Sequence, residues 1–193
     1  MPTNPPDHLN NIERALIDNL RDGTYNTTAG IGSGTAWSSA DVTVFGQFPT
    51  TDETKYPCVI TEMVANGIET QYMGQNLTDR TGTAAKGELY GVGFNIYIVV
   101  DKDSSITITN TTTGGDIAQP YKERRLLNYL MLNCANILID CDFDSITKGA
   151  AGTPAPTEIE ERHFSGFRDM GYNVELETWM ALASMVVVFK NSR

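Results

Sequence analysis

The sequence predicts an α+β fold, in which a mainly antiparallel β-sheet carries two α-helices on one face and long polar loops join the elements. Two segments, at about 8–22 and 120–140, repeat apolar residues with helical spacing. The chain between and after them alternates apolar and polar residues, which is typical of strands with one buried face. Helices and strands do not alternate, so a doubly wound parallel sheet is not expected. The 193 residues are predicted to form a single domain.

The first helix is predicted over about residues 8–22, after a flexible N-terminus of residues 1–7. Asp7 can cap the free N–H groups of its first turn, and Gly23 suits its C-terminal end. Its apolar positions recur three or four residues apart and share one face: Leu9, Ile12, Leu16 and Leu20.

Two polar segments are expected to be long loops or arms. Residues 24–56 are rich in Thr, Ser, Gly and Asp and contain one short predicted strand within 41–48, and residues 74–87 form the second segment. We expect the stretch 26–39 to be a mobile arm, so that its deletion leaves the fold intact and impairs assembly.

The clearest predicted strand is 88–101, whose alternate residues from Tyr90 to Val100 are all apolar. Its other face carries Gly91, Gly93 and Asn95, which are small enough for another layer or subunit to approach closely. Before it, residues 58–73 predict a hairpin that turns at Asn66–Gly67. After it, residues 104–110 predict a short partner strand.

The second helix is predicted from about Pro120 to Asp140, with proline at its start, where a missing N–H costs nothing. Its apolar face is broad enough to lie across a sheet. The chain is expected to end in two strands, within 158–170 and 172–189, joined near Gly171.

Charge and composition narrow the class of protein. Lys and Arg number 14 against 24 Asp and Glu, a net charge of −10, which argues against tight binding of nucleic acid. The negative charge is still compatible with a protein whose negatively charged wall lets DNA slide past without sticking. No apolar run reaches the length of a membrane helix, and no secretion signal is recognised, so a cytosolic site of synthesis is expected.

The glycines of "NTTAGIGSGTAWSS", residues 26–39, resemble a phosphate-binding turn. A Walker loop requires Lys followed by Ser or Thr after the last glycine, whereas Thr35 and Ala36 follow here. A dinucleotide-binding turn requires a preceding strand and a following helix, and neither is predicted. We therefore interpret the stretch as a loop and expect no cofactor.

The acidic triplet Asp140, Asp142 and Asp144 imitates the start of a calcium-binding loop. Ser145 and Ala151 occupy the positions where that loop requires Gly and Glu. An acidic helix end explains the triplet without an ion, so no metal site is assigned, although ion binding is left open.

No catalytic constellation is recognised in the sequence. The two histidines, His8 and His163, lie in no known hydrolase or protease signature. Cys58 and Cys134 fall in apolar runs and are interpreted as core residues. The chain is therefore not expected to be an enzyme.

Charged residues at two places could meet across a subunit boundary. Lys122, Arg124 and Arg125 open the second helix, where a solvated helix face is the ordinary explanation. Their candidate partners in a neighbouring copy are the acidic residues that open the terminal strand pair: Glu158, Glu160 and Glu161.

The order of elements resembles the tail terminator, or tail-completion, proteins of tailed bacteriophages and related viruses, the family of the lambda minor tail protein U. The similarity rests on the pattern of segments over most of residues 8–189, not on a diagnostic motif. The segments are "LNNIERALIDNLRD", "YPCVITEM", "GELYGVGFNIYIVVDKD", "YKERRLLNYLMLNCANIL" and "MGYNVELETWMALASMVVVF".

The resemblance implies a structural virion protein without catalytic activity. It implies a homo-oligomeric, hexameric ring at the head-proximal end of the tail tube, which stops tube polymerisation and joins the tail to the neck. Its partners would be the tail tube protein and a neck or head-completion protein, with genomic DNA crossing the lumen without specific binding. Assembly would take place in the host cytoplasm, with no membrane involved.

Two alternatives remain at this point. The chain could be another structural virion protein, either a tail tube subunit or a head-completion protein of the neck. It could also be a small soluble hydrolase or ligand-binding domain. Tube subunits stack indefinitely, whereas a terminator stops at one ring and a ligand-binding domain would be a monomer that saturates with a small molecule.

Overall fold

The computed structural model of the chain describes residues 8–25, 34–50, 54–64, 69–78, 84–112, 115–141 and 158–192. Its two helices and its strands follow in the order α1 (His8–Asp22), β1 (Thr24–Tyr25), β2 (Gly34–Thr35), β3 (Thr43–Phe45), β4 (Cys58–Met63), β5 (Glu69–Thr78), β6 (Ala84–Asp101), β7 (Ser105–Thr112), β8 (Gly115–Lys122), α2 (Glu123–Asp140), β9 (Glu158–Asn173) and β10 (Thr178–Ser192).

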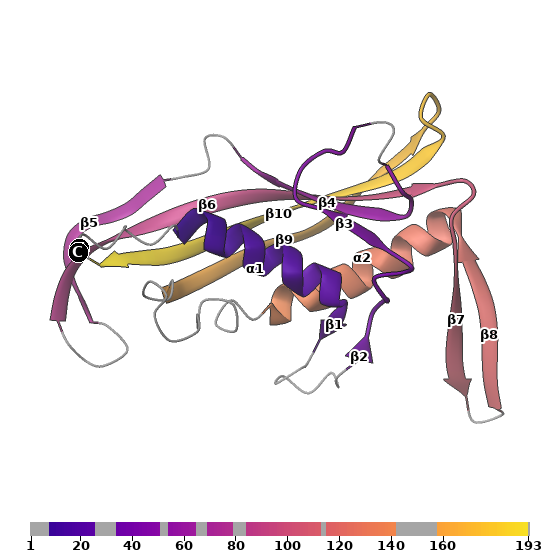
Figure 1. Ribbon diagram of the computed structural model, residues 1–193, viewed down its shortest axis with the longest axis horizontal. Helices are drawn as coiled ribbons and strands as arrows, with labels where there is room; N and C mark the ends of the chain where they lie inside the picture. Colours follow the sequence, from indigo (N-terminus) through magenta and orange to yellow (C-terminus); the bar gives the residue numbers. More distant parts are fainter. Residues whose placement is uncertain are drawn as a thin grey trace, which may run out of the picture.

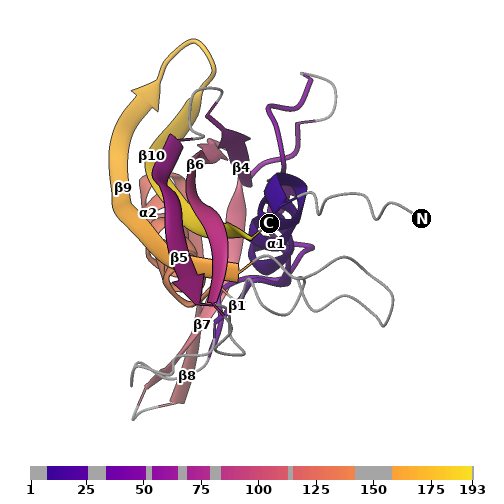
Figure 2. The same ribbon diagram turned by 90° about the vertical axis from the view of Figure 1, so that its left-hand side faces the viewer.

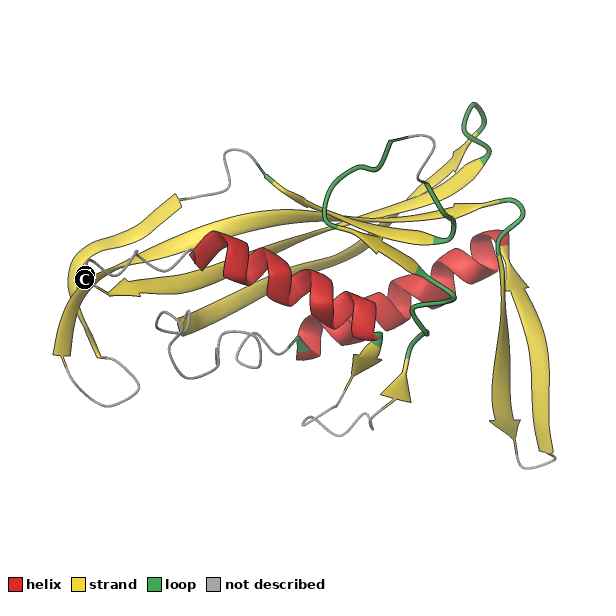
Figure 3. Cartoon of the chain, viewed as in Figure 1, coloured by secondary structure: helices red, strands yellow, loops and turns green. Residues whose placement is uncertain are grey.

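The main sheet is mostly antiparallel, as predicted, with the strand order β3-β4-β6-β10-β9 (Figures 1 and 3). Only the short β3 pairs in parallel, with β4. The long strands β6 and β10 form its centre and pair without a bulge from Asp101–Thr178 to Gly87–Ser192. Figure 2, viewed along the long axis, shows β9 and β10 following β6 across the curved sheet.

Both helices pack on one face of this sheet, which we call the inner face. Val92, Phe94, Ile96, Ile98 and Val100 of β6 point to this side and form one buried cluster with residues of both helices. The cluster contains Ile12, Leu16 and Leu20 of α1 and Leu126, Leu127, Leu130 and Cys134 of α2. The expected apolar faces of the first helix and of the strand 88–101 are thus confirmed, and so is the α+β class.

The described residues of the segment 74–87 are not a loop, contrary to expectation, and 79–83 lie outside the described part. Its first residues belong to β5 and its last to β6, and the two strands pair antiparallel from Thr78–Ala84 to Glu69–Gly91. Polar, Gly-containing strands are poorly marked by composition, because the preference for a strand depends more on the neighbours that it meets than on the segment itself.

The hairpin expected at Asn66–Gly67 is also wrong. That dipeptide lies outside the described residues, but β4 and β5 on either side of it run in the same direction along one edge of β6. The Val64 N–H donates to the Gly93 oxygen at 2.9 Å, between the two paired stretches. The hairpins lie instead between β5 and β6 and between β9 and β10.

Residues 105–122 form a hairpin of their own. The strand expected within 104–110 pairs with β8 and not with the main sheet. Pro120, where a helix was predicted to begin, belongs to β8. Helix α2 therefore starts at Glu123. The final turn lies at residues 174–177, not at Gly171, which is still within β9.

The expected loop 24–56 contributes to the core through Ala36 and Trp37, which are 2% and 3% exposed. The Trp37 indole N–H donates to the Leu20 oxygen at 3.0 Å, and the Ala36 N–H donates to the Gly23 oxygen at 2.7 Å. Gly23 adopts a φ of 63°, and a Cβ there would overlap with the Trp37 backbone oxygen. The expectation that 26–39 can be deleted without loss of the fold is therefore wrong for its last residues, while 26–33 lie outside the described part.

Replacing Trp37 with Ala is expected to lower the free energy of unfolding by about 3–5 kcal/mol, because a buried indole and its hydrogen bond to α1 are lost together. Urea-induced unfolding followed by circular dichroism measures the change. Phe48→Ala serves as the control, since that side chain is 50% exposed and should cost about 1 kcal/mol or less. Equal losses in the two variants would contradict a core role for Trp37.

Candidate functional site

The candidate functional surface is the outer face of the main sheet, opposite the helices. On β10, the residues that alternate with the core point outward, and those from Met180 to Val188 carry no charge. Ser184 is exposed, Val186 is 36% exposed, and Met180 and Leu182 are half-buried. We call these four residues the outer strip.

The neighbouring strands border the outer strip differently. On β6 the register sets Tyr97, Asn95 and Gly93 opposite Leu182, Ser184 and Val186. On β9 it sets Arg168 opposite Leu182 and His163 opposite Val186. The β6 border therefore carries no charge and has no side chain at Gly93, whereas the β9 border carries the side chains of Arg168 and His163. The small residues that the sequence placed on this side of β6 do face the outer surface.

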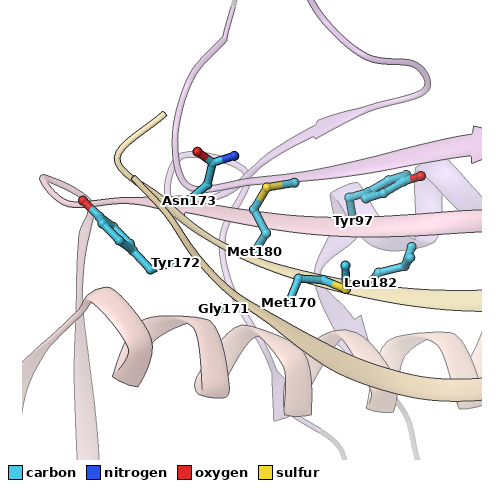
Figure 4. A pocket seen from close by; sticks show the side chains of 7 residues that line it. All are labelled: Tyr97, Met170, Gly171, Tyr172, Asn173, Met180 and Leu182. Atoms are coloured by element: carbon cyan, nitrogen blue, oxygen red, sulfur yellow. The ribbon is translucent and has the colours of Figure 1, made fainter. Parts of the chain in front are cut away.

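A shallow apolar hollow of about 280 Å³ lies at one end of the outer strip (Figure 4). Its wall consists of Tyr97, Met170, Gly171, Tyr172, Asn173, Met180 and Leu182. The Phe48 ring packs 4.9 Å from that of Tyr97, so the hollow borders a second buried cluster on the outer face, made of Cys58, Ile60 and Val99. The Tyr97 hydroxyl donates to a Glu62 oxygen at 3.3 Å.

Exposed apolar side chains gather at the turn between β9 and β10, next to the hollow. Val174 and Leu176 are 77% and 62% exposed, and Met170 is 56% exposed. Contiguous apolar surface of this kind is typical of protein interaction sites. The outer strip, the hollow and this turn together form a surface suited to another protein.

The hairpin β7–β8 extends away from the main sheet in both views (Figures 1 and 2). Its base is attached to α2, where Ile106 is buried and the Tyr121 and Tyr129 rings lie 5.5 Å apart. A two-stranded hairpin is only marginally stable on its own, so a projecting one is suited to contact a partner.

The basic residues predicted at an interface lie at the start of α2, close to the β9–β10 turn. Arg124 forms an ion pair with Asp169 at 3.1 Å and lies 5.9 Å above the Trp179 ring. Arg125 donates to the Gln119 side chain at 3.0 Å and stacks 4.0 Å from the Tyr121 ring. Lys122 is the last residue of β8. All three cations are exposed.

The acidic residues predicted as their partners lie at the opposite end of β9. Glu160 forms an ion pair with Lys190, and Glu161 pairs with His163 at 3.1 Å. Glu158 pairs in register with Lys190 at the start of the strand. The acidic and basic groups therefore do not meet within the chain, and their pairing across a subunit boundary stays a prediction.

The three cysteines, all within the described residues, are buried. Burial, with a contribution from Asp101, raises the pKa of the Cys58 thiol to about 12, and burial alone raises that of Cys134. Cys141 is also buried and forms no disulfide with another described residue. The core role expected for Cys58 and Cys134 is confirmed. His163 is an exposed strand residue on the outer face.

Several sequence motifs have no described geometry. The glycines Gly30 and Gly32 and the acidic residues Asp142 and Asp144 lie outside the described residues. Across the part of the chain with assigned positions, no group of three or more His, Cys, Asp or Glu side chains could hold a metal ion. Within that same part, neither helix combines the length and apolarity needed to cross a membrane.

Sequence reasoning did not identify the outer strip. Leu182 and Val186 sit within the apolar run "MALASMVVVF", which reads as a buried strand, and nothing local marks which alternate set faces the helices. The signal that was available is the small-residue face of the strand 88–101.

The sequence matches no protein-family model, and no curated protein matches it.

In the native protein, we expect the three cysteines to react with an aromatic disulfide reagent at pH 8 only after unfolding. Burial blocks access to all three thiols, and the raised pKa of Cys58 and Cys134 leaves almost no thiolate at those two positions. The same raised pKa means that the unfolded chain loses its thiol protons first, so the free energy of unfolding should fall as the pH rises from about 9 towards 12. Absorbance follows the labelling of the thiols. Urea titrations at several pH values measure the free energy of unfolding. Rapid labelling of the folded chain would contradict the assignment.

Proposed function

We propose that this chain is a structural subunit of a tailed-phage-type virion, a tail terminator that forms a ring of six copies on the last ring of the tail tube. The ring stops tube polymerisation and offers a surface to the neck or head-completion protein. The resemblance of the segment order to the tail terminator family motivates the proposal.

The proposal rests mainly on one observation, which is that the helices cover only one face of the main sheet. Helices bury the inner face, while the outer strip and the adjoining hollow remain uncharged and partly exposed. A strip of uncharged and partly apolar side chains left open to water on one face of a sheet is suited to contact with another protein. Together with the projecting β7–β8 hairpin, this surface supports a role in assembly.

The net charge of −10 fits the same role. A lumen lined by acidic subunits repels the DNA backbone, so DNA can cross without being held. The charge does not by itself distinguish a terminator from a tube subunit or a neck protein, because each of these would surround the same DNA.

The decisive experiment is electron microscopy and native mass spectrometry of the purified protein, alone and with the tail tube protein. A terminator should give single rings or unassembled subunits alone, and it should cap tubes and shorten their length distribution when present during polymerisation. The tube protein polymerised without it is the control.

Long tubes built from this chain alone would favour a tube subunit and contradict the terminator. A monomer that never binds tube protein, and that gains thermal stability with a small apolar compound at the hollow, would favour a ligand-binding domain.

A further inference from the structure

Helix α2 has a solvent face without charge. No charged residue occurs from Leu126 to Ile139, and Leu132 and Ile139 are 65% and 63% exposed. At 3.6 residues per turn they share one stripe with Asn128, Ala135 and Asn136. We call this set the α2 stripe.

The solvent face of helix α1, in contrast, is charged. Its solvent face carries Glu13, Arg14, Asp18 and Arg21, and Arg14 pairs with Asp18 at 3.6 Å. Surface helices ordinarily have such a charged face. The α2 stripe is therefore unusual within the same molecule and is suited to burial.

We propose that the α2 stripe packs on the outer strip of a second copy of this chain, and that this contact joins neighbours in the ring; the inference rests on the proposed ring. The stripe faces away from the inner side of the sheet and the outer strip faces the other way, so one chain presents both halves of the contact. Such a head-to-tail contact can repeat until the ring closes, whereas a contact between two identical patches stops at a dimer.

The dimensions of the two surfaces agree. Leu132 and Ile139 are seven residues apart, about 10 Å along a helix. Leu182 and Val186 are four residues apart, about 13 Å along a strand. Leu132 can therefore enter the hollow beside Leu182 while Ile139 lies on Val186, where Gly93 on β6 leaves room for the helix.

Ring closure decides the direction of the helix. In a ring of six, neighbours differ by a rotation of about 60°, so corresponding helices cannot run antiparallel. Helix α2 must then cross the neighbouring sheet in the same sense as that sheet's own α2, with its start towards the β9–β10 turn. There Arg125 comes towards the exposed Glu175 of the neighbour, a contact of opposite charges.

This register replaces the pairing expected from the sequence. Glu160 and Glu161 lie at the far end of the neighbouring sheet from Arg125, and they keep Lys190 and His163 of their own chain. The basic start of α2 remains part of the interface, with a different acidic partner.

Cysteine crosslinking tests the contact directly, because the three natural thiols are buried. A chain carrying both Ile139→Cys and Val186→Cys should form a disulfide-linked ladder of copies on oxidation, resolved on a non-reducing gel. A mixture of the two single variants should form linked heterodimers and nothing larger. Arg14→Cys combined with Val186→Cys is the matched control and should give no ladder.

Charge variants give a second measurement that does not depend on disulfide geometry. Ile139→Glu and Val186→Glu should each weaken self-association at least about tenfold. Ile139→Lys combined with Val186→Glu should restore part of it. Arg14→Gln, which changes the net charge by the same amount on α1, should leave it unchanged. Circular dichroism and thermal unfolding establish that each variant is folded.

Three outcomes would overturn the inference. Linked dimers of the Ile139→Cys variant alone would show that two α2 stripes pair with each other. Rings that tolerate both glutamate variants would place the contact elsewhere and leave the terminator proposal standing. A wild-type chain that stays monomeric and never binds tube protein would remove both the interface and the proposed function.

Discussion

The antiparallel pairing of β6 with β10 is the constraint on which the rest of the structure depends. The two strands keep one register from Asp101–Thr178 to Gly87–Ser192. Because side chains alternate along a strand, this register decides at once which residues meet the helices and which face outward. A slip by one residue would bring Ser184 into the core and expose Met185. The strip on the outer face is therefore as firmly placed as the core itself.

The two helices that cover the inner face of this sheet differ in the surface that they turn to solvent. Helix α1 closes the inner face and turns charged residues to water, whereas α2 closes it and turns an uncharged stripe outward. Burying two exposed aliphatic side chains contributes about 3–6 kcal/mol. Association of two proteins costs about 4–15 kcal/mol, so one such junction is weak by itself. In the proposed ring, every copy would make one such contact on each side. Several weak contacts would then hold the ring together on the tube end.

The interior of this protein could be predicted well where apolar periodicity is strong. The inward set of β6 and the buried face of α1 follow the predicted pattern, although Leu9 and Tyr90 are only half-buried and Ala15 joins the buried face of α1. Prediction failed where pairing partners, not apolar faces, decide the structure. The segment 74–87 is polar yet forms strands, because β5 completes its hydrogen bonds on β6. Trp37 lies in a stretch of loop composition, and its burial depends on the Leu20 oxygen at the end of α1.

Local periodicity and composition were enough to predict the α+β class, the two helices, the central strand and the burial of Cys58 and Cys134, and they give the net negative charge directly. Only the tertiary structure decided that β4 and β5 share one edge of β6, that residues 105–122 leave the sheet as a hairpin, and which side of β10 faces water. Those features depend on contacts between residues far apart in the chain. For the same reason, the outer strip and the α2 stripe could be proposed as partners only after the fold had set them on opposite sides of the chain.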